Sequence, residues 1–207
     1  VIGELQSENL FAIYLDPQNQ WFRYHHLFQE LLQNELRKTF SAKDIANVHM
    51  RACIWFETHD FIGEAIHHAL QSGDAVFAAR IVERHCYSEM EEDRWVVVER
   101  WLALIPEDIS KQRPTILIAK ALVASAAQRF DQLISFTNEA ELLIADGKGS
   151  RGQEGELNFL KGIADFWGGA FEESIRYLES AKLKLESHKN VLIAEVDLHL
   201  SIVRYMS

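Results

Sequence analysis

Cysteine, proline and long apolar runs are all scarce in this sequence. The two cysteines, Cys53 and Cys86, are too few for a disulfide framework or for a zinc site built from cysteines. The three prolines, Pro17, Pro106 and Pro114, stand where helices would start or end, which favours long helices. No apolar run approaches the roughly 20 residues that a membrane-spanning helix needs, and nothing at the start resembles a signal peptide. We therefore expect a reducing, cytoplasmic setting.

Basic residues are scarce as well. The 21 Lys and Arg face 31 Asp and Glu, which gives a formal net charge of −10. Phosphate binding depends on clustered Lys and Arg, so this balance argues against a general attraction to nucleic acid or to an anionic membrane surface. The 207 residues are 48% hydrophobic, enough to bury a substantial core. Because the chain begins at Val1 and stops at "SIVRYMS", we expect a piece of a longer protein.

Groupings that carry catalysis are also lacking. His49 and Cys53 have the i, i+4 spacing of metal ligands, but a metal needs three or four donors and no further pair converges on them. The "GKGS" stretch at 147–150 lacks the spacing of a phosphate-binding loop. No serine, cysteine or carboxylate pair comes with a placed base, so an all-helical enzyme would lack its catalytic residues. We expect no enzyme activity, no metal and no cofactor in this segment.

The sequence begins with a predicted β-hairpin and continues as helices. "LFAIYL" and "WFRY" flank "DPQNQ", whose Asp16-Pro17 pair is typical of turns, so the hairpin is expected over residues 10–24. Apolar side chains then recur with a helical period, on a stripe formed by Leu27, Phe28, Leu31, Leu32 and Leu36. Further helices are predicted at 42–58, 61–72, 75–92, 95–104, 114–128, 131–145, 154–168, 172–187 and 190–206.

Helix pairs repeat along the second half of the chain. "ALVASAAQRFDQLISFTNEAE" and "GIADFWGGAFEESIRYLESAK" align at an offset of 171 − 130 = 41 residues. The alignment pairs Ala121 with Gly162, Phe130 with Phe171, Ile134 with Ile175, Thr137 with Leu178, and Ala140 with Ala181. Small residues at these places let helices approach closely, and the aromatic fills the gap between neighbouring pairs. The order resembles the tetratricopeptide repeat of about 34 residues, with the excess placed in a Gly-rich loop at 146–155.

Three stretches resemble the MalT-like regulators of the LuxR type, which are signal-transduction proteins of the STAND class. They are the aromatic-Arg-Tyr-His-His-Leu-Phe run at 22–28, the unit from Trp55 to Ala69, and Trp101-Leu102 before Ile105-Pro106. The resemblance implies a mainly α fold with a winged-helix remnant at 1–38 and a tetratricopeptide-like α-α superhelix at 39–207. It also implies an ATPase before this segment and a DNA-binding helix-turn-helix after it, so ATP and DNA would serve only missing domains.

The resemblance leaves two interpretations of the cluster around the hairpin, which comprises Trp21, Phe22, Tyr24, His25, His26 and Phe28. Aromatic side chains of this kind commonly pack a hairpin against the following helix. A functional contact is the alternative, and His25 is then the residue expected to touch a neighbouring domain.

Ligand binding, if it occurs, is expected in the groove of the superhelix. The first helix of each pair would line it with Thr115, Ile118, Leu122, Ser125, Glu156, Phe159, Ile163, Phe166 and Trp167. Phe159, Ile163, Phe166 and Trp167 are the predicted ligand-binding residues, since an exposed aromatic stacks on a ring or grips a side chain. The alternative is that Phe166 and Trp167 pack against the next repeat. The expected partner is a small-molecule inducer or a regulatory protein, with self-association also open, and a free-standing protein-interaction scaffold remains the second function.

Overall fold

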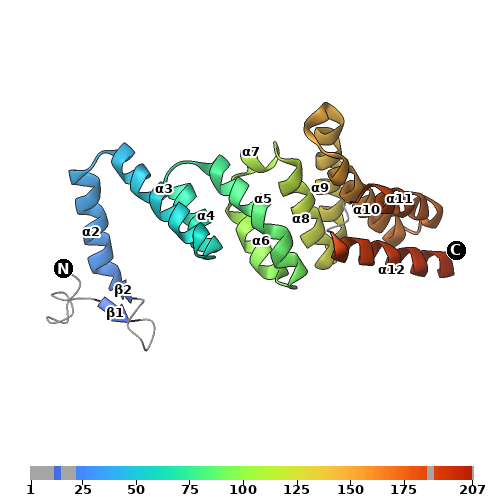
Figure 1. The fold of residues 1–207 in the computed structure, drawn as a ribbon, viewed down its shortest axis with the longest axis horizontal. Helices are drawn as coiled ribbons and strands as arrows, with labels where there is room; N and C mark the ends of the chain where they lie inside the picture. Colours follow the sequence, from blue (N-terminus) through green and yellow to red (C-terminus); the bar gives the residue numbers. More distant parts are fainter. Residues whose placement is uncertain (1–11, 15–21, 186–188, 207) are drawn as a thin grey trace. The chain divides into compact units, whose positions relative to one another are not determined.

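The computed structural model describes residues 12–14, 22–185 and 189–206, and it confirms a mainly α fold (Figure 1). The chain divides into two compact units, residues 1–51 and residues 52–207. No helix in the described part is long and apolar enough to cross a membrane.

The first unit holds the predicted hairpin and the helix that follows it. Strand β1 (Ala12–Tyr14) pairs antiparallel with β2 (Phe22–Tyr24), with Ala12 opposite Tyr24. Helix α2 (His26–Thr39) begins two residues later, and the Tyr24 and Phe28 rings meet edge to face at 5.4 Å. The expected packing of hairpin against helix is therefore confirmed at this pair. Trp21 and the turn between the strands lie outside the described residues.

Helix α2 ends at Thr39 for local reasons. Arg37 and Lys38 occupy its last turn, where positive charge complements the helix dipole, and Phe40 takes an extended conformation. Ser41 then accepts a hydrogen bond from the Asp44 N–H, which caps the start of α3 (Ala42–Thr58). The predicted domain boundary at residue 38 lies next to this turn and stays a prediction, because the two compact units meet within α3, at Arg51.

The second unit is a succession of antiparallel helices (Figure 1). After the end of α3, its elements are α4 (Ile62–Gln71), α5 (Ala75–Glu91), α6 (Trp95–Leu104), α7 (Glu107–Ser110), α8 (Pro114–Ala126), α9 (Phe130–Leu143), the π-helix η1 (Ile144–Lys148), α10 (Arg151–Trp167), α11 (Phe171–Lys184) and α12 (Asn190–Met206). The predicted helices at 42–58, 95–104 and 190–206 have the observed bounds, and α7 was not predicted. Arg113, just before α8, donates from Nε and Nη2 to the two Glu83 oxygens on α5, at 2.8 and 2.6 Å.

Five turns between helices share one backbone device. A residue with positive φ stands two positions before the next helix: Asp60, Gly73, Asp93, Gln128 and Gly169. The residue after it donates its N–H back to a carbonyl one turn earlier, as Arg129 does to Ala124 at 2.8 Å. Similar turns therefore connect consecutive helices at similar geometry, which is how a repeating stack arises.

The small residues of the predicted repeat lie at close helix contacts. Ala121, Gly162, Ala140 and Ala181 are all buried, as their alignment requires. A Cβ added to Gly162 would come within 2.7 Å of Leu178 Cγ on α11. The Ser174 hydroxyl also donates to the Gly162 carbonyl at 2.8 Å, which shows how closely α10 and α11 approach.

The aligned phenylalanine and isoleucine pairs are less buried than the small residues. Phe130 and Phe171 begin α9 and α11 and are half-buried. Ile134 is exposed, whereas its counterpart Ile175 is half-buried and packs against the core. The repeat is therefore exact for the small residues and approximate for the aliphatic ones.

The prediction of a Gly-rich loop over 146–155 is wrong from residue 151 onward. Ser150 and Gln153 form a capping box, in which each side chain accepts from the backbone N–H of the other, so α10 already begins at Arg151. Gly155 lies inside that helix, where an added Cβ would be 2.7 Å from the Leu185 backbone nitrogen. This glycine permits close packing against the end of α11 and gives the chain no flexible loop.

Candidate functional site

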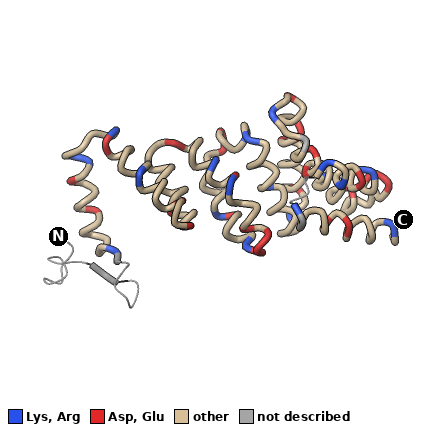
Figure 2. The backbone as a smooth tube through the Cα atoms, viewed as in Figure 1, with Lys and Arg blue, Asp and Glu red and all other residues tan. Residues whose placement is uncertain are grey.

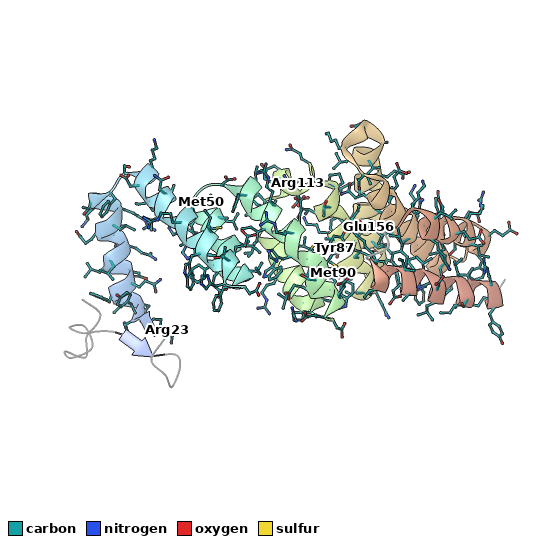
Figure 3. All side chains as sticks on the ribbon, in the orientation of Figure 1. Arg23, Met50, Tyr87, Met90, Arg113 and Glu156 are labelled. Carbon is teal, nitrogen blue, oxygen red and sulfur yellow. The ribbon has the colours of Figure 1, made fainter. Side chains whose placement is uncertain are left out.

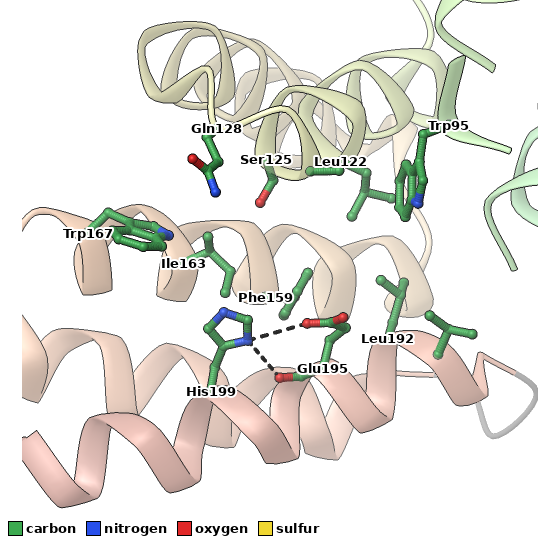
Figure 4. Close-up of a pocket in the computed structure, with 12 residues that line it drawn as sticks. Trp95, Leu122, Ser125, Gln128, Phe159, Ile163, Trp167, Leu192, Glu195 and His199 are labelled. Carbon is green, nitrogen blue, oxygen red and sulfur yellow. Dashed lines mark hydrogen bonds and ion pairs between the residues drawn. The ribbon is translucent and has the colours of Figure 1, made fainter. Parts of the chain in front are cut away.

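A groove with a volume of about 200 Å³ lies between α8, α10 and α12, with Trp95 of α6 at one end (Figure 4). α8 and α10 each pack against the helix that follows them, α9 and α11, and α12 lies against α10 and α11. Its lining residues are Trp95, Leu122, Ser125, Ala126, Gln128, Phe159, Ile163, Trp167, Val191, Leu192, Glu195 and His199.

Three of the four predicted ligand-binding residues line this groove. Phe159 and Ile163 form part of its apolar floor, and Trp167 stands at the end opposite Trp95 with 55% of its surface exposed. Phe166 is not among the lining residues, since its ring lies against Phe171 at 6.2 Å and against His199 at 5.9 Å. Binding by any of these residues stays a prediction.

Of the other residues predicted to line the groove, some line it and others do not. Leu122 and Ser125 line it, whereas Ile118 is fully buried in the core. Thr115 is engaged by the Gln153 side chain, whose Nε2 donates to its hydroxyl at 2.8 Å. Glu156 is also fully buried and belongs to a separate cluster of polar groups.

The polar end of the groove comes from α12, which the sequence interpretation did not assign to it. Nδ1 of His199 is 2.9 Å from the Glu195 carbonyl oxygen and 3.6 Å from the Glu195 carboxylate (Figure 4). Both neighbours are acceptors, so Nδ1 carries a proton, and in the neutral ring Nε2 is an acceptor. The Glu-x-x-x-His spacing was visible in the sequence, but only the stacking of α12 on α10 brings it into the groove.

A buried ionic cluster holds the start of α12. Glu156 on α10 is 0% exposed; its Oε2 accepts a hydrogen bond from the Tyr87 hydroxyl at 2.9 Å, and its Oε1 pairs with the Lys189 ammonium. The same ammonium lies 3.6 Å from the centre of the Tyr87 ring. Burial lowers the pKa of Lys189 to about 8. Tyr87 and Glu156, which the hydrogen bond from the Tyr87 hydroxyl joins, are labelled in Figure 3.

The cluster adjoins the groove. A narrow space lined by Tyr87, Met90, Glu91 and Lys189 continues from it and shares Trp95, Leu122, Val191 and Leu192 with it. The position of α12, and with it the width of the groove, therefore depends on a residue directly before that helix.

Other candidates from the sequence form no site in the described part of the chain. Cys53 and Cys86 are buried thiols, and burial raises their pKa to about 11 and about 12. No three His, Cys, Asp or Glu side chains of the described residues come together as metal ligands would. The His25 ring lies 4.3 Å from the His26 ring and is tilted against it by 35°, and its expected contact with a neighbouring domain stays a prediction.

One comparison with known proteins bears on the first unit. Residues 1–44 match the family model of the MalT winged helix domain. The matched stretch contains β1, β2 and α2, the hairpin and helix described above. No solved structure matches the chain. The winged-helix part of the resemblance is thus supported for residues 1–44.

Proposed function

We propose that the helical region, residues 39–207, is the signal-sensing segment of an ATP-dependent, LuxR-type transcription regulator of the STAND class, and that the groove binds its inducer. The match of residues 1–44 to the MalT winged helix domain supports the kind of regulator. The groove itself carries the assignment of sensing, because it is a concave, mainly apolar site with a few convergent polar groups, as small-molecule sites are.

In this proposal the segment binds and does not catalyse. ATP and DNA are handled by other parts of the full-length regulator, in the cytoplasm. Acidic residues are interspersed with basic ones along the described helices (Figure 2). None of these helices carries the cluster of Lys and Arg that DNA binding would need.

A protein-interaction scaffold is the second candidate. A stable protein interface buries roughly 800 Å² on each partner, so a partner protein would contact the surface around the groove as well as the groove itself. The compact size of the groove favours a small molecule.

A thermal-shift screen of the full chain tests the choice. Small metabolites that raise the melting temperature of the wild type, but not of Trp167→Ala, would support sensing in the groove. Trp55→Ala is the matched control, because Trp55 is 46% exposed on α3 and does not line the groove. A response to peptides or proteins alone, with none to metabolites, would favour the scaffold.

A further inference from the structure

We infer that the ligand of the groove is a cation, a compact molecule that carries a protonated amine on an apolar or aromatic body. The inference rests on the proposed function, because it names the chemical class of inducer for the same groove.

The first observation is the aromatic lining. Trp95 and Trp167 stand at the two ends, and Phe159 lies between them on α10 (Figure 4). Trp167 keeps most of its surface exposed although its ring contacts Phe130 at 5.1 Å. The faces of tryptophan and phenylalanine rings carry negative partial charge, so they attract cations as well as apolar groups.

The second observation is the charge of the lining. Glu195 is the one formally charged side chain among the described residues that line the groove, and it is 47% exposed. Among the described residues, no Lys or Arg is paired with this carboxylate, and the neutral His199 ring brings no positive charge to it. A ligand that brings its own positive charge would supply the missing partner.

The third observation is the direction of the hydrogen bonds. His199 donates from Nδ1 to the Glu195 carbonyl, so the neutral ring offers Nε2 as an acceptor. The Glu195 carboxylate is an acceptor as well. The α12 wall of the groove therefore presents two acceptors, and an ammonium group is a donor in every direction.

The fourth observation concerns Lys189, the lysine that lines the adjoining narrow space. Its charge is matched by the buried Glu156 and its ammonium faces the Tyr87 ring. Because Lys189 is already paired with Glu156, we do not count it as a partner of Glu195.

The test uses three probes with one ring and three charges: phenethylamine, 2-phenylethanol and 3-phenylpropanoate. Their dissociation constants for the full chain are measured by titration calorimetry at low ionic strength. We expect phenethylamine to bind about tenfold more tightly than the alcohol, with the anion weakest, since a cation–π contact and an ion pair together supply about that factor.

The variants Glu195→Gln and Glu172→Gln complete the design. Glu172 is exposed on α11 and does not line the groove, so its substitution makes the same change of net charge elsewhere. Glu195→Gln should remove the preference for the amine over the alcohol, and Glu172→Gln should keep it. The melting temperature of each variant shows whether it is folded, and Glu195→Asp, which keeps the charge, should keep the preference.

The outcomes separate the two proposals. Equal binding of amine and alcohol, or preference for the anion, would overturn the cationic ligand while leaving a small-molecule groove. An amine preference that survives in Glu195→Gln would also overturn it. If none of the three probes binds and the chain responds only to peptides or proteins, both this inference and the sensing function fail.

Discussion

Lys189, the residue directly before α12, pairs its ammonium with Glu156, a carboxylate on α10 that is fully buried. The Tyr87 hydroxyl on α5 completes the cluster by donating to the second Glu156 oxygen at 2.9 Å. Three elements far apart in the chain thus meet at one polar point within the core. Because α12 supplies Glu195 and His199 to the groove, this cluster positions the side of the groove that carries the hydrogen-bond acceptors.

Lys189→Met should destabilise the protein, because it leaves the buried Glu156 carboxylate without its counter-charge. Removing one partner of a buried ion pair typically costs about 3–5 kcal/mol of the free energy of unfolding. Urea unfolding of the full chain measures this loss. The double variant Lys189→Met with Glu156→Gln should recover most of it, since no uncompensated charge remains. Losses that simply add in the double variant would show that the two groups are not coupled.

Gly162→Ala should destabilise the contact between α10 and α11. The new methyl group would meet Leu178 Cγ at 2.7 Å and the Ser174 carbonyl oxygen at 3.3 Å, and overpacking of this kind costs about 1–3 kcal/mol. Gly63→Ala is the matched control, because its Cβ would find only Trp101 Nε1, at an ordinary 3.5 Å. Thermal unfolding should show a lower melting temperature for the first variant only. Equal melting temperatures would mean that the close approach is absent.

Asp93→Gly should stabilise the turn between α5 and α6. Asp93 has a φ of 60°, a conformation that costs a side-chain-bearing residue about 1 kcal/mol and costs glycine little. The reverse change at an equivalent turn, Gly73→Ala, should destabilise by a similar amount, because Gly73 has a φ of 85° and an added Cβ would meet no neighbour. Both effects are read from the melting temperature. Changes of the same sign in the two variants would contradict the shared turn geometry.

The thiols of Cys53 and Cys86 should be unreactive in the folded protein. Burial raises their pKa to about 11 and about 12, so at pH 8 both are neutral and shielded from a disulfide reagent. An aromatic disulfide reagent should therefore modify neither thiol at pH 8 until guanidinium unfolds the chain.

The same pKa shifts make the stability of the folded protein depend on pH. An unfolded thiol releases its proton near pH 9, whereas the folded ones hold theirs until about pH 11 to 12. The folded state then binds more protons, so the contribution of the thiols is complete below pH 9 and is lost as the pH rises through that window. Rapid modification of one thiol per native chain by the disulfide reagent at pH 8 would contradict the burial of the thiols.

The spacing of apolar residues along the chain was enough to predict most of the helices. It failed where a contact between helices decides the local structure. The period of apolar residues predicted α6 and α12 with their observed bounds, since each helix buries one face. The start of α10 was missed because Gly155 suggested a flexible loop. In the structure that glycine lies where Leu185 leaves no room for a Cβ, a fact about a segment 30 residues later.

The candidate site divides in the same way. Phe159, Ile163 and Trp167 could be proposed from one helix, because their spacing puts them on one face. Glu195 and His199 could not, since nothing in their own neighbourhood tells which helix α12 faces. Phe166, predicted with them, does not line the groove, because a face of a helix is wider than the part of it that a groove exposes.

By itself the sequence determined most of the helices and the small residues at their contacts, because these depend on spacing within one or two turns of chain. The tertiary structure alone decided the groove and its charge. The Lys189–Glu156 pair and the docking of α12 join groups that are distant in sequence, and such contacts depend on the summed geometry of every turn between them.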